Sequence, residues 1–268
     1  MDHFDFLGWI YHGGGRELYQ KFYDEIIKQN VHVIPTCIGV TAQPLGWFAK
    51  PIRNMDDIKK LKWRIGGFAA EVWSSIGSST LMIPPGEILP AGERGIIGGA
   101  EWSIPAVDIT FGFYDVWKNY EMPSVAEISN NGELLINKDV WNKLPPDLRY
   151  IIEAACMEGD FHFVIGTFLR NAQALETLQK KHGVKIIRTP NEVLEAYLEA
   201  WDTKVAPKYI KKYPFFKEVL DSQRKWASYV VPAHAFIEPD RMWLTKRYWP
   251  NGGALGYDVN KLIETNRK

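Results

Sequence analysis

The feature that most constrains the fold is a helical pattern of unusual length, which runs from Pro145 to about Lys181. After the prolines at its start, this stretch contains only two residues that interrupt the helical pattern, Gly159 and Gly166. A helix of that length usually braces two parts of a protein or two subunits. The sequence therefore predicts that one long helix joins separate parts of this fold.

Short strands and helices alternate on both sides of this pattern. In LKWRIGG, alternation places Leu61, Trp63 and Ile65 on one face of a strand and Arg64 on the other. Further strands are expected at 31–37, 183–189 and, as a buried strand, 132–141, and helices at 13–29, at 106–119 and in the closing segments after 190. LPAGERG, with Pro90 and Gly92, is expected to be a turn. This alternation predicts an α/β fold.

Charge and hydropathy exclude several classes of partner. Lys plus Arg and Asp plus Glu both number 32, so the net charge of zero favours neither nucleic acid nor an anionic membrane surface. No apolar run reaches the roughly 20 residues of a membrane span. The first residues have no basic and apolar signal regions, so no secretory signal is expected in the chain as written. The partner expected is a small molecule or a protein.

The cysteines and histidines show no catalytic spacing. Cys37 and Cys156 lie far apart in the sequence. A disulfide between them is one alternative, although two free thiols are the more common outcome. No H-E-x-x-H, G-x-S-x-G or P-loop motif accompanies the histidines, among them His12, His32, His162 and His182. An enzyme is therefore not expected.

Three polar residues stand at expected strand ends or loops: Gln43, Arg64 and Glu101, the last beside Trp102. An arginine can hold a carboxylate with two parallel hydrogen bonds, and amide, carboxylate and carbonyl oxygens suit a hard cation. Together they would recognise a small acid with a second oxygen beside its carboxylate. The alternative is that Arg64 and Glu101 only form an ion pair and that Gln43 is a surface residue.

Four stretches in order carry a family resemblance: WIYHGGGRELYQKFY, TAQPLGWFAKPIRNMDDIKKLKWRIGGFAAEVW, GGAEWSIPAVDITFGFYDVWKNY and LLINKDVWNKLPPDLRYIIEAA. The chain resembles the substrate-binding proteins of tripartite ATP-independent periplasmic (TRAP) transporters. The likeness is greatest to the branch that binds 2-oxo acids such as pyruvate, and related hydroxy acids such as lactate.

The resemblance implies a periplasmic, two-lobed binding protein of the type II α/β fold, with a long bracing helix and a helical C-terminus. Arg64 matches the arginine that pairs with the substrate carboxylate. Gln43, Glu101 and the backbone carbonyl of Trp102 match the ligands of a bound sodium or calcium ion, beside the substrate. The TRAP membrane subunits are the expected partners, and a homodimer is also expected because some relatives exchange helices.

The resemblance begins in mid-domain, so the first lobe is expected to be incomplete. The implied ranges are 1–30 for the remainder of that lobe, 31–140 for the hinge and the ligand-binding second lobe, 141–182 for the long helix, and 183–268 for a C-terminal part suited to dimerisation. Val125 and Ala126 stand before Glu127 where relatives carry an aromatic pair, so the pocket wall there is smaller. The competing hypothesis is a fragment that serves as an interaction module without binding a solute.

Overall fold

The computed structural model describes residues 1–259, which form two compact units, each assembled from three segments of chain. Unit 1 contains residues 1–42, 128–168 and 209–238. Unit 2 contains residues 43–127, 169–208 and the segment from 239 onward. The four ranges expected from the sequence describe lobes and their roles, and they stay a prediction.

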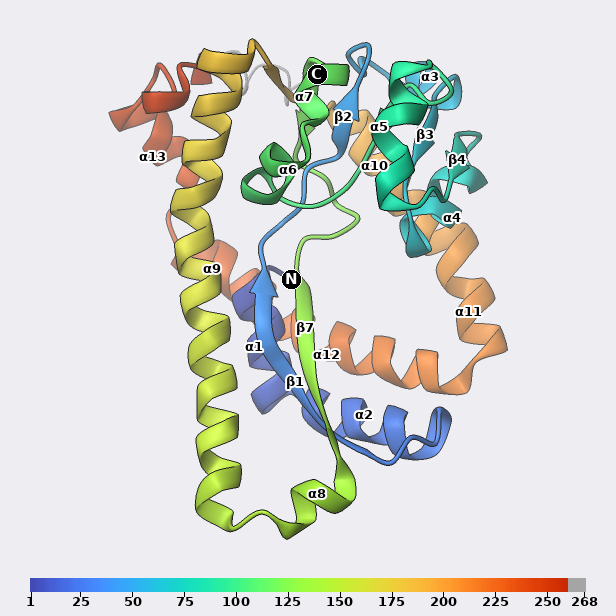
Figure 1. The fold of residues 1–268 in the computed structure, drawn as a ribbon, viewed down its shortest axis with the longest axis vertical. Helices are drawn as coiled ribbons and strands as arrows, with labels where there is room; N and C mark the ends of the chain where they lie inside the picture. Colours follow the sequence, from blue (N-terminus) through green and yellow to red (C-terminus); the bar gives the residue numbers. More distant parts are fainter. Residues whose placement is uncertain (260–268) are drawn as a thin grey trace. The chain divides into compact units, whose positions relative to one another are not determined.

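Unit 1 is built on an antiparallel pair of strands, β1 (Val31–Val40) and β7 (Asn130–Asn137), which lie side by side in Figure 1. The register of the pair shifts between Ile34 and Ile38. The helical elements with residues in this unit are α1 (His3–His12), α2 (Gly15–Lys21), a π-helical turn (Phe22–Ile26), α8 (Lys138–Lys143), the first part of α9 (Pro146–His182), the end of α11 (Ala206–Lys212) and α12 (Pro214–Ile237).

The long helix expected from the sequence is confirmed as α9, which has 37 residues (Figure 1). Residues 146–168 belong to unit 1 and residues 169–182 to unit 2. The strand expected at 132–141 is β7, but it is not buried. Its residues are exposed or half-buried, and in the described chain β7 pairs with β1 alone.

Helix α1 was not predicted, although its start carries a recognisable signal. The Asp5 backbone N–H donates to the Asp2 carboxylate at 2.9 Å, and the Asp2 N–H donates to the Asp5 carboxylate at 3.1 Å. This reciprocal capping box satisfies two N–H groups that a helix start leaves unpaired. Gly14, at φ 86°, then makes the turn into α2, so the glycine run forms a tight turn.

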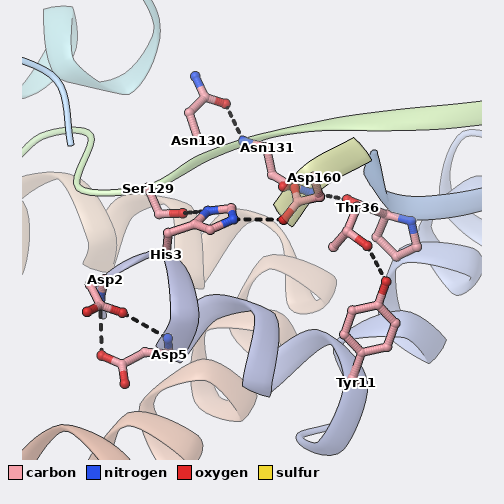
Figure 2. A network of polar contacts seen from close by, with 10 residues as sticks. Asp2, His3, Asp5, Tyr11, Thr36, Ser129, Asn130, Asn131 and Asp160 are labelled. Atoms are coloured by element: carbon pink, nitrogen blue, oxygen red, sulfur yellow. Dashed lines mark hydrogen bonds and ion pairs between the residues drawn. The ribbon is translucent and has the colours of Figure 1, made fainter. Parts of the chain in front are cut away.

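A buried polar network joins α1 to α9 and to the start of β7 (Figure 2). The His3 ring contacts Asp160 at 3.0 Å through Nε2 and the Ser129 hydroxyl at 3.1 Å through Nδ1. His3 and Asp160 are only 4% and 2% exposed. Leaving one buried partner of such a contact without its hydrogen bond typically costs about 1–3 kcal/mol, so this contact anchors the first helix of unit 1.

Unit 2 is organised around a six-stranded mixed sheet with the order β4-β3-β5-β2-β6-β8. In chain order the strands are β2 (Gly46–Phe48), β3 (Lys62–Arg64), β4 (Ser79–Leu81), β5 (Gly99–Ala100), β6 (Asn119–Met122) and β8 (Lys185–Arg188). Trp63 and Ile65 are buried on one side of β3, as the alternation in LKWRIGG predicts. Strands β2, β4 and β6 were not predicted.

The remaining helical elements are α3 (Met55–Lys59), α4 (Gly67–Ser75), α5 (Pro85–Glu93), α6 (Pro105–Phe111), α7 (Phe113–Val116), α10 (Asn191–Ala200), a π-helical turn (Trp201–Val205), α13 (Arg241–Tyr248) and a 3-10 turn (Gly253–Leu255). Two expectations are wrong here. The helix expected at 106–119 is broken at Gly112, whose φ of 78° ends α6. The turn expected at LPAGERG lies largely in α5, which contains Pro90.

A tertiary contact explains why glycine stands in α5. A Cβ atom on Gly92 would lie 2.6 Å from the Trp117 ring, so only glycine lets the helix approach that ring. Trp117 belongs to the buried core of unit 2, with Trp47, Phe113 and Tyr120. Within residues 1–259 no helix has both the length and the apolar character to cross a membrane.

The buried Glu121 makes the stability of unit 2 depend on pH. Burial raises the pKa of Glu121 to about 8, although its carboxylate accepts the Ile52 N–H at 2.6 Å. From its ordinary pKa of 4.5 up to about 8, the unfolded chain has lost this proton while the folded chain still holds it. The free energy of unfolding must therefore fall as pH rises through this window.

We expect Glu121→Gln, which imitates the protonated side chain, to remove this part of the pH dependence. Each unit of pKa difference is worth about 1.4 kcal/mol, so the variant should be more stable than the parent by a few kcal/mol above pH 8 and equal to it below pH 4. Urea unfolding across this pH range measures the difference. The exposed Glu93→Gln serves as control, and parallel pH curves for parent and Glu121→Gln would contradict the assignment.

Candidate functional site

The strand order of unit 2 brings four separate chain segments to one edge of the sheet. Strands β3 and β5 are parallel, so their carboxyl ends, at Arg64 and just before Glu101, lie at the same edge. Strand β2 is antiparallel to β5, so the residues that lead into it, including Gln43, lie there too. Strand β6 is antiparallel to β2, so the segment after it, which contains Glu127, reaches the same edge.

Arg64 and Glu101 are joined by two hydrogen bonds. Arg64 Nη1 donates to the Glu101 backbone oxygen at 2.7 Å and to Glu101 Oε2 at 3.2 Å. The side chains are 15% and 14% exposed, so the pair is largely screened from water. Arg64 Nε is buried and has no hydrogen-bond partner among residues 1–259. One side of the guanidinium is therefore occupied, while a buried donor remains for another acceptor.

Trp102 lies beside this pair and helps to hold it. The guanidinium carbon of Arg64 is 5.0 Å from the centre of the Trp102 ring, within the range of a cation–π contact. The Trp102 ring also contacts the Phe111 ring, and the two ring centres lie 4.8 Å apart. The aromatic ring thus helps to restrict the rotamers of Arg64.

Gln43 and Glu127 meet Glu101 around a small cavity. The Gln43 backbone N–H donates to the backbone oxygen of Glu127 at 2.9 Å. Gln43, Glu101 and Glu127 line the cavity together with Ser124. The enclosed space is about 10 Å³, close to the volume that one water molecule needs. Gln43 Oε1 is buried and finds no hydrogen-bond partner in the part of the chain that the structure describes.

Negative charge at this cavity is only partly compensated. Burial raises the pKa of Glu101 to about 7, Glu127 raises it further through charge repulsion, and Arg64 acts in the opposite direction without cancelling them. An ordinary surface carboxylate has a pKa near 4. The edge therefore offers a buried carboxylate, a second acid and an unpaired amide oxygen, a set that suits a cation with a preference for oxygen.

Asp108 fixes the loop that carries Glu101 and Trp102. Its carboxylate accepts hydrogen bonds from Trp47 Nε1 at 2.9 Å, from the Tyr120 hydroxyl at 2.8 Å and from the Ser103 N–H at 3.0 Å. Burial raises the pKa of Asp108 to about 6, and these three donors limit the rise. Asp108 is thus a positioning residue that ties the loop after β5 to β2 and β6.

The structure places all the residues singled out in the sequence at this edge: Gln43, Arg64, Glu101 and Trp102. The ion pair considered as an alternative role for Arg64 and Glu101 is present as well. Glu127 was not singled out as a site residue, although the pocket wall expected at Val125 and Ala126 comes directly before it, and Ala126 does line the cavity. Among residues 1–259 no group of three or more His, Cys, Asp and Glu side chains suits a metal ion.

Comparison with known families and curated proteins gives two findings. Residues 4–212 match the family described as bacterial extracellular solute-binding protein, family 7. Over 189 residues the chain is 34% identical to a curated protein of Nostoc sp. named monocarboxylate 2-oxoacid-binding periplasmic protein. The match covers 70% of this chain and 50% of the Nostoc protein, so the chain spans about half the length of that relative.

Solved structures of TRAP solute-binding proteins share the fold. One from Bordetella bronchiseptica, a dimer with calcium and picolinate in its active site, is 31% identical with a TM-score of 0.80, over 88% of this chain and 69% of that one. One from Colwellia psychrerythraea, with calcium and pyruvate, is 29% identical with a TM-score of 0.82, over 92% and 73%. One from Pseudoalteromonas atlantica, with sodium and pyruvate, is 29% identical with a TM-score of 0.78, over 90% and 71%. The expected α/β binding-protein fold is confirmed.

Proposed function

Since the chain belongs to family 7 of the bacterial extracellular solute-binding proteins, we propose that it is the solute-binding component of a TRAP transporter. Its ligand is a small monocarboxylate, a 2-oxo acid such as pyruvate or a hydroxy acid such as lactate, bound together with a cation. The observation that carries this proposal is that an arginine with an unpaired buried donor lies at the same sheet edge as a small cavity, which Gln43, Glu101 and Glu127 line together with apolar side chains.

Arg64 is the group that binds the carboxylate of the acid. Its Nη1 is occupied by Glu101, whereas its Nε lacks a partner among the described residues. A buried donor without an acceptor costs free energy, and a ligand carboxylate placed against it would recover that cost through a charge-assisted bond. A small acid has little apolar surface, so this bond supplies much of its affinity.

Gln43, Glu101 and the backbone carbonyl of Trp102 are the protein ligands of the cation, with Glu127 as a further source of negative charge. The unpaired Gln43 oxygen and the excess negative charge around Glu101 support this assignment, because both are relieved by a cation. The space of about 10 Å³ suits an ion but not an acid, so the acid lies beside the ion. When bound, the cation would attract the oxygen next to the ligand's carboxylate.

The cellular setting follows the relatives. The Nostoc relative is a periplasmic protein, and we place this chain in the periplasm, where it delivers the acid to the TRAP membrane subunits. A homodimer is supported by large apolar side chains that are exposed along the part of α9 in unit 1, at Tyr150, Ile151, Met157, Phe161, Ile165 and Phe168. The competing hypothesis of an interaction module gives no role to the unpaired donor of Arg64 or to the unpaired acceptor of Gln43 at the sheet edge.

Thermal unfolding of the full chain with candidate ligands tests the function. Pyruvate, a longer 2-oxo acid, lactate and a dicarboxylate are each added with calcium, with sodium and with chelator. A ligand at about a hundred times its Kd stabilises by about 2.7 kcal/mol, which should raise the Tm by roughly 5–10 °C. We expect that shift for a monocarboxylate with a cation and a smaller one with chelator. A cooperative transition that no acid moves would favour the interaction module instead.

A further inference from the structure

Unit 1 contains two thiols that are distant in sequence and adjacent in space. Cys37 lies on β1 and Cys156 on α9, and both are free. In addition to burial, the Cys37 side chain lies close enough to Cys156 to raise the pKa of the Cys156 thiol. Cys156 forms an apolar cluster with Ile34 and Trp141, and Cys37 packs against that same cluster. The contact therefore joins the strand pair of unit 1 to its long helix.

The local backbone explains how the two thiols come so close. Cys37 lies within the stretch of β1 where the register to β7 shifts, between Ile34 and Ile38. Such an irregularity bends a strand and redirects a side chain. On the helix, a Cβ atom added at Gly159 would lie only 3.3 Å from the Cys37 backbone oxygen. Because Gly159 has no side chain, β1 can approach α9 one helical turn away from Cys156.

We propose that Cys37 and Cys156 are a redox-active dithiol that a disulfide oxidant converts into an intrachain disulfide between β1 and α9. The family is one of extracellular proteins, and compartments outside the cytoplasm are those in which disulfides form and persist. The proposal is independent of the acid-binding site, because both cysteines belong to unit 1 and the sheet edge belongs to unit 2.

The difference in burial assigns the order of the two steps. Cys37 is half-buried, so its thiolate attacks a sulfur of the oxidant first, which forms a mixed disulfide and releases one thiolate. Cys156, only 4% exposed, then attacks the Cys37 sulfur and releases the second thiolate. Two S–H bonds of the protein lose their protons, two electrons pass to the oxidant, and the oxidant leaves as two thiols.

The second step should be slow and should accelerate with pH. Burial raises the pKa of the Cys156 thiol above its ordinary value. Only a small fraction of Cys156 is then thiolate at neutral pH, and the thiolate is the attacking form. The mixed disulfide on Cys37 is therefore expected to accumulate briefly before the intrachain bond forms.

The test incubates the full chain with oxidised glutathione or with reduced glutathione, then alkylates it in denaturant and measures its mass. After oxidation we expect a monomer that has lost two hydrogen atoms, takes up no alkylating reagent and yields one linked pair of peptides containing residues 37 and 156. Closing so long a loop should raise the Tm by several degrees relative to the reduced chain.

Cys37→Ser is the matched control, since the side chain it changes is only half-buried. This variant should leave Cys156 unmodified and should show no change in Tm on oxidation. The proposal is overturned if both thiols of the parent remain open to alkylation after oxidation. Stable glutathione on Cys37 with no intrachain link, or a disulfide between two chains, would overturn it equally.

Discussion

Arg64→Ala should weaken binding of the acid strongly while the protein still folds. Arg64 contributes the unpaired buried donor at the sheet edge, and truncating one partner of a buried, hydrogen-bonded charge pair typically costs about 2–5 kcal/mol. The affinity for pyruvate should then fall roughly thirtyfold to several-thousandfold. Calorimetric titration with pyruvate in the presence of calcium measures this loss directly.

Arg64→Lys separates charge from geometry. Lysine retains the positive charge but lacks the planar fork that binds a carboxylate with two bonds, so we expect its affinity to remain at least about tenfold below that of the parent. The exposed Arg94→Ala, in the same unit and with the same loss of charge, should bind as the parent does. Unchanged affinity in Arg64→Ala would show that the arginine is only a structural partner of Glu101.

Glu101→Gln should remove the dependence of acid binding on the cation. The substitution keeps the shape of the side chain but removes its charge from the cavity that it shares with Gln43 and Glu127. Losing a carboxylate ligand from a buried site should weaken calcium binding by about 3 kcal/mol, roughly a hundredfold. Arg64 is retained in this variant, so acid binding measured with chelator should not weaken.

Two titrations of each protein, with calcium and with chelator, distinguish the roles. The parent should bind the acid more tightly with calcium, whereas Glu101→Gln should bind it with the same affinity under both conditions. Glu93→Gln, an exposed carboxylate of the same unit, should behave as the parent. If calcium still strengthens acid binding in Glu101→Gln to the parental extent, Glu101 is not a ligand of the ion.

Much of the local structure could be predicted because its causes are local. Helix α9 forms where 37 residues contain few helix breakers, and β3 forms where large apolar side chains alternate with polar ones. Where the prediction was wrong, a tertiary contact or a backbone angle that the local hydrophobic pattern does not contain determined the structure. Gly112 takes a positive φ and ends α6, and Gly92 stays in a helix where it packs against Trp117.

The same division applies to the candidate site. Gln43, Arg64, Glu101 and Trp102 could be singled out because glycine, proline and strand ends surround them and because a family resemblance was present. Their proximity could not be derived from spacing, since it depends on which strands pair. The order β3-β5-β2-β6 places together residues that are up to 84 positions apart, from Gln43 to Glu127. Glu127 was not singled out, although the neighbouring Val125 and Ala126 were expected in the pocket wall.

By itself the sequence determined the types of several elements, the length of the long helix and the candidate residues for an acid and a cation, because periodicity and side-chain chemistry are properties of short stretches. Only the tertiary structure decided that Glu127 joins Glu101 and Gln43, and that Cys37 meets Cys156. These contacts join residues that are distant in the chain. They form only when strand pairing and helix packing repay the entropy of closing long loops, and no short window of sequence contains that balance.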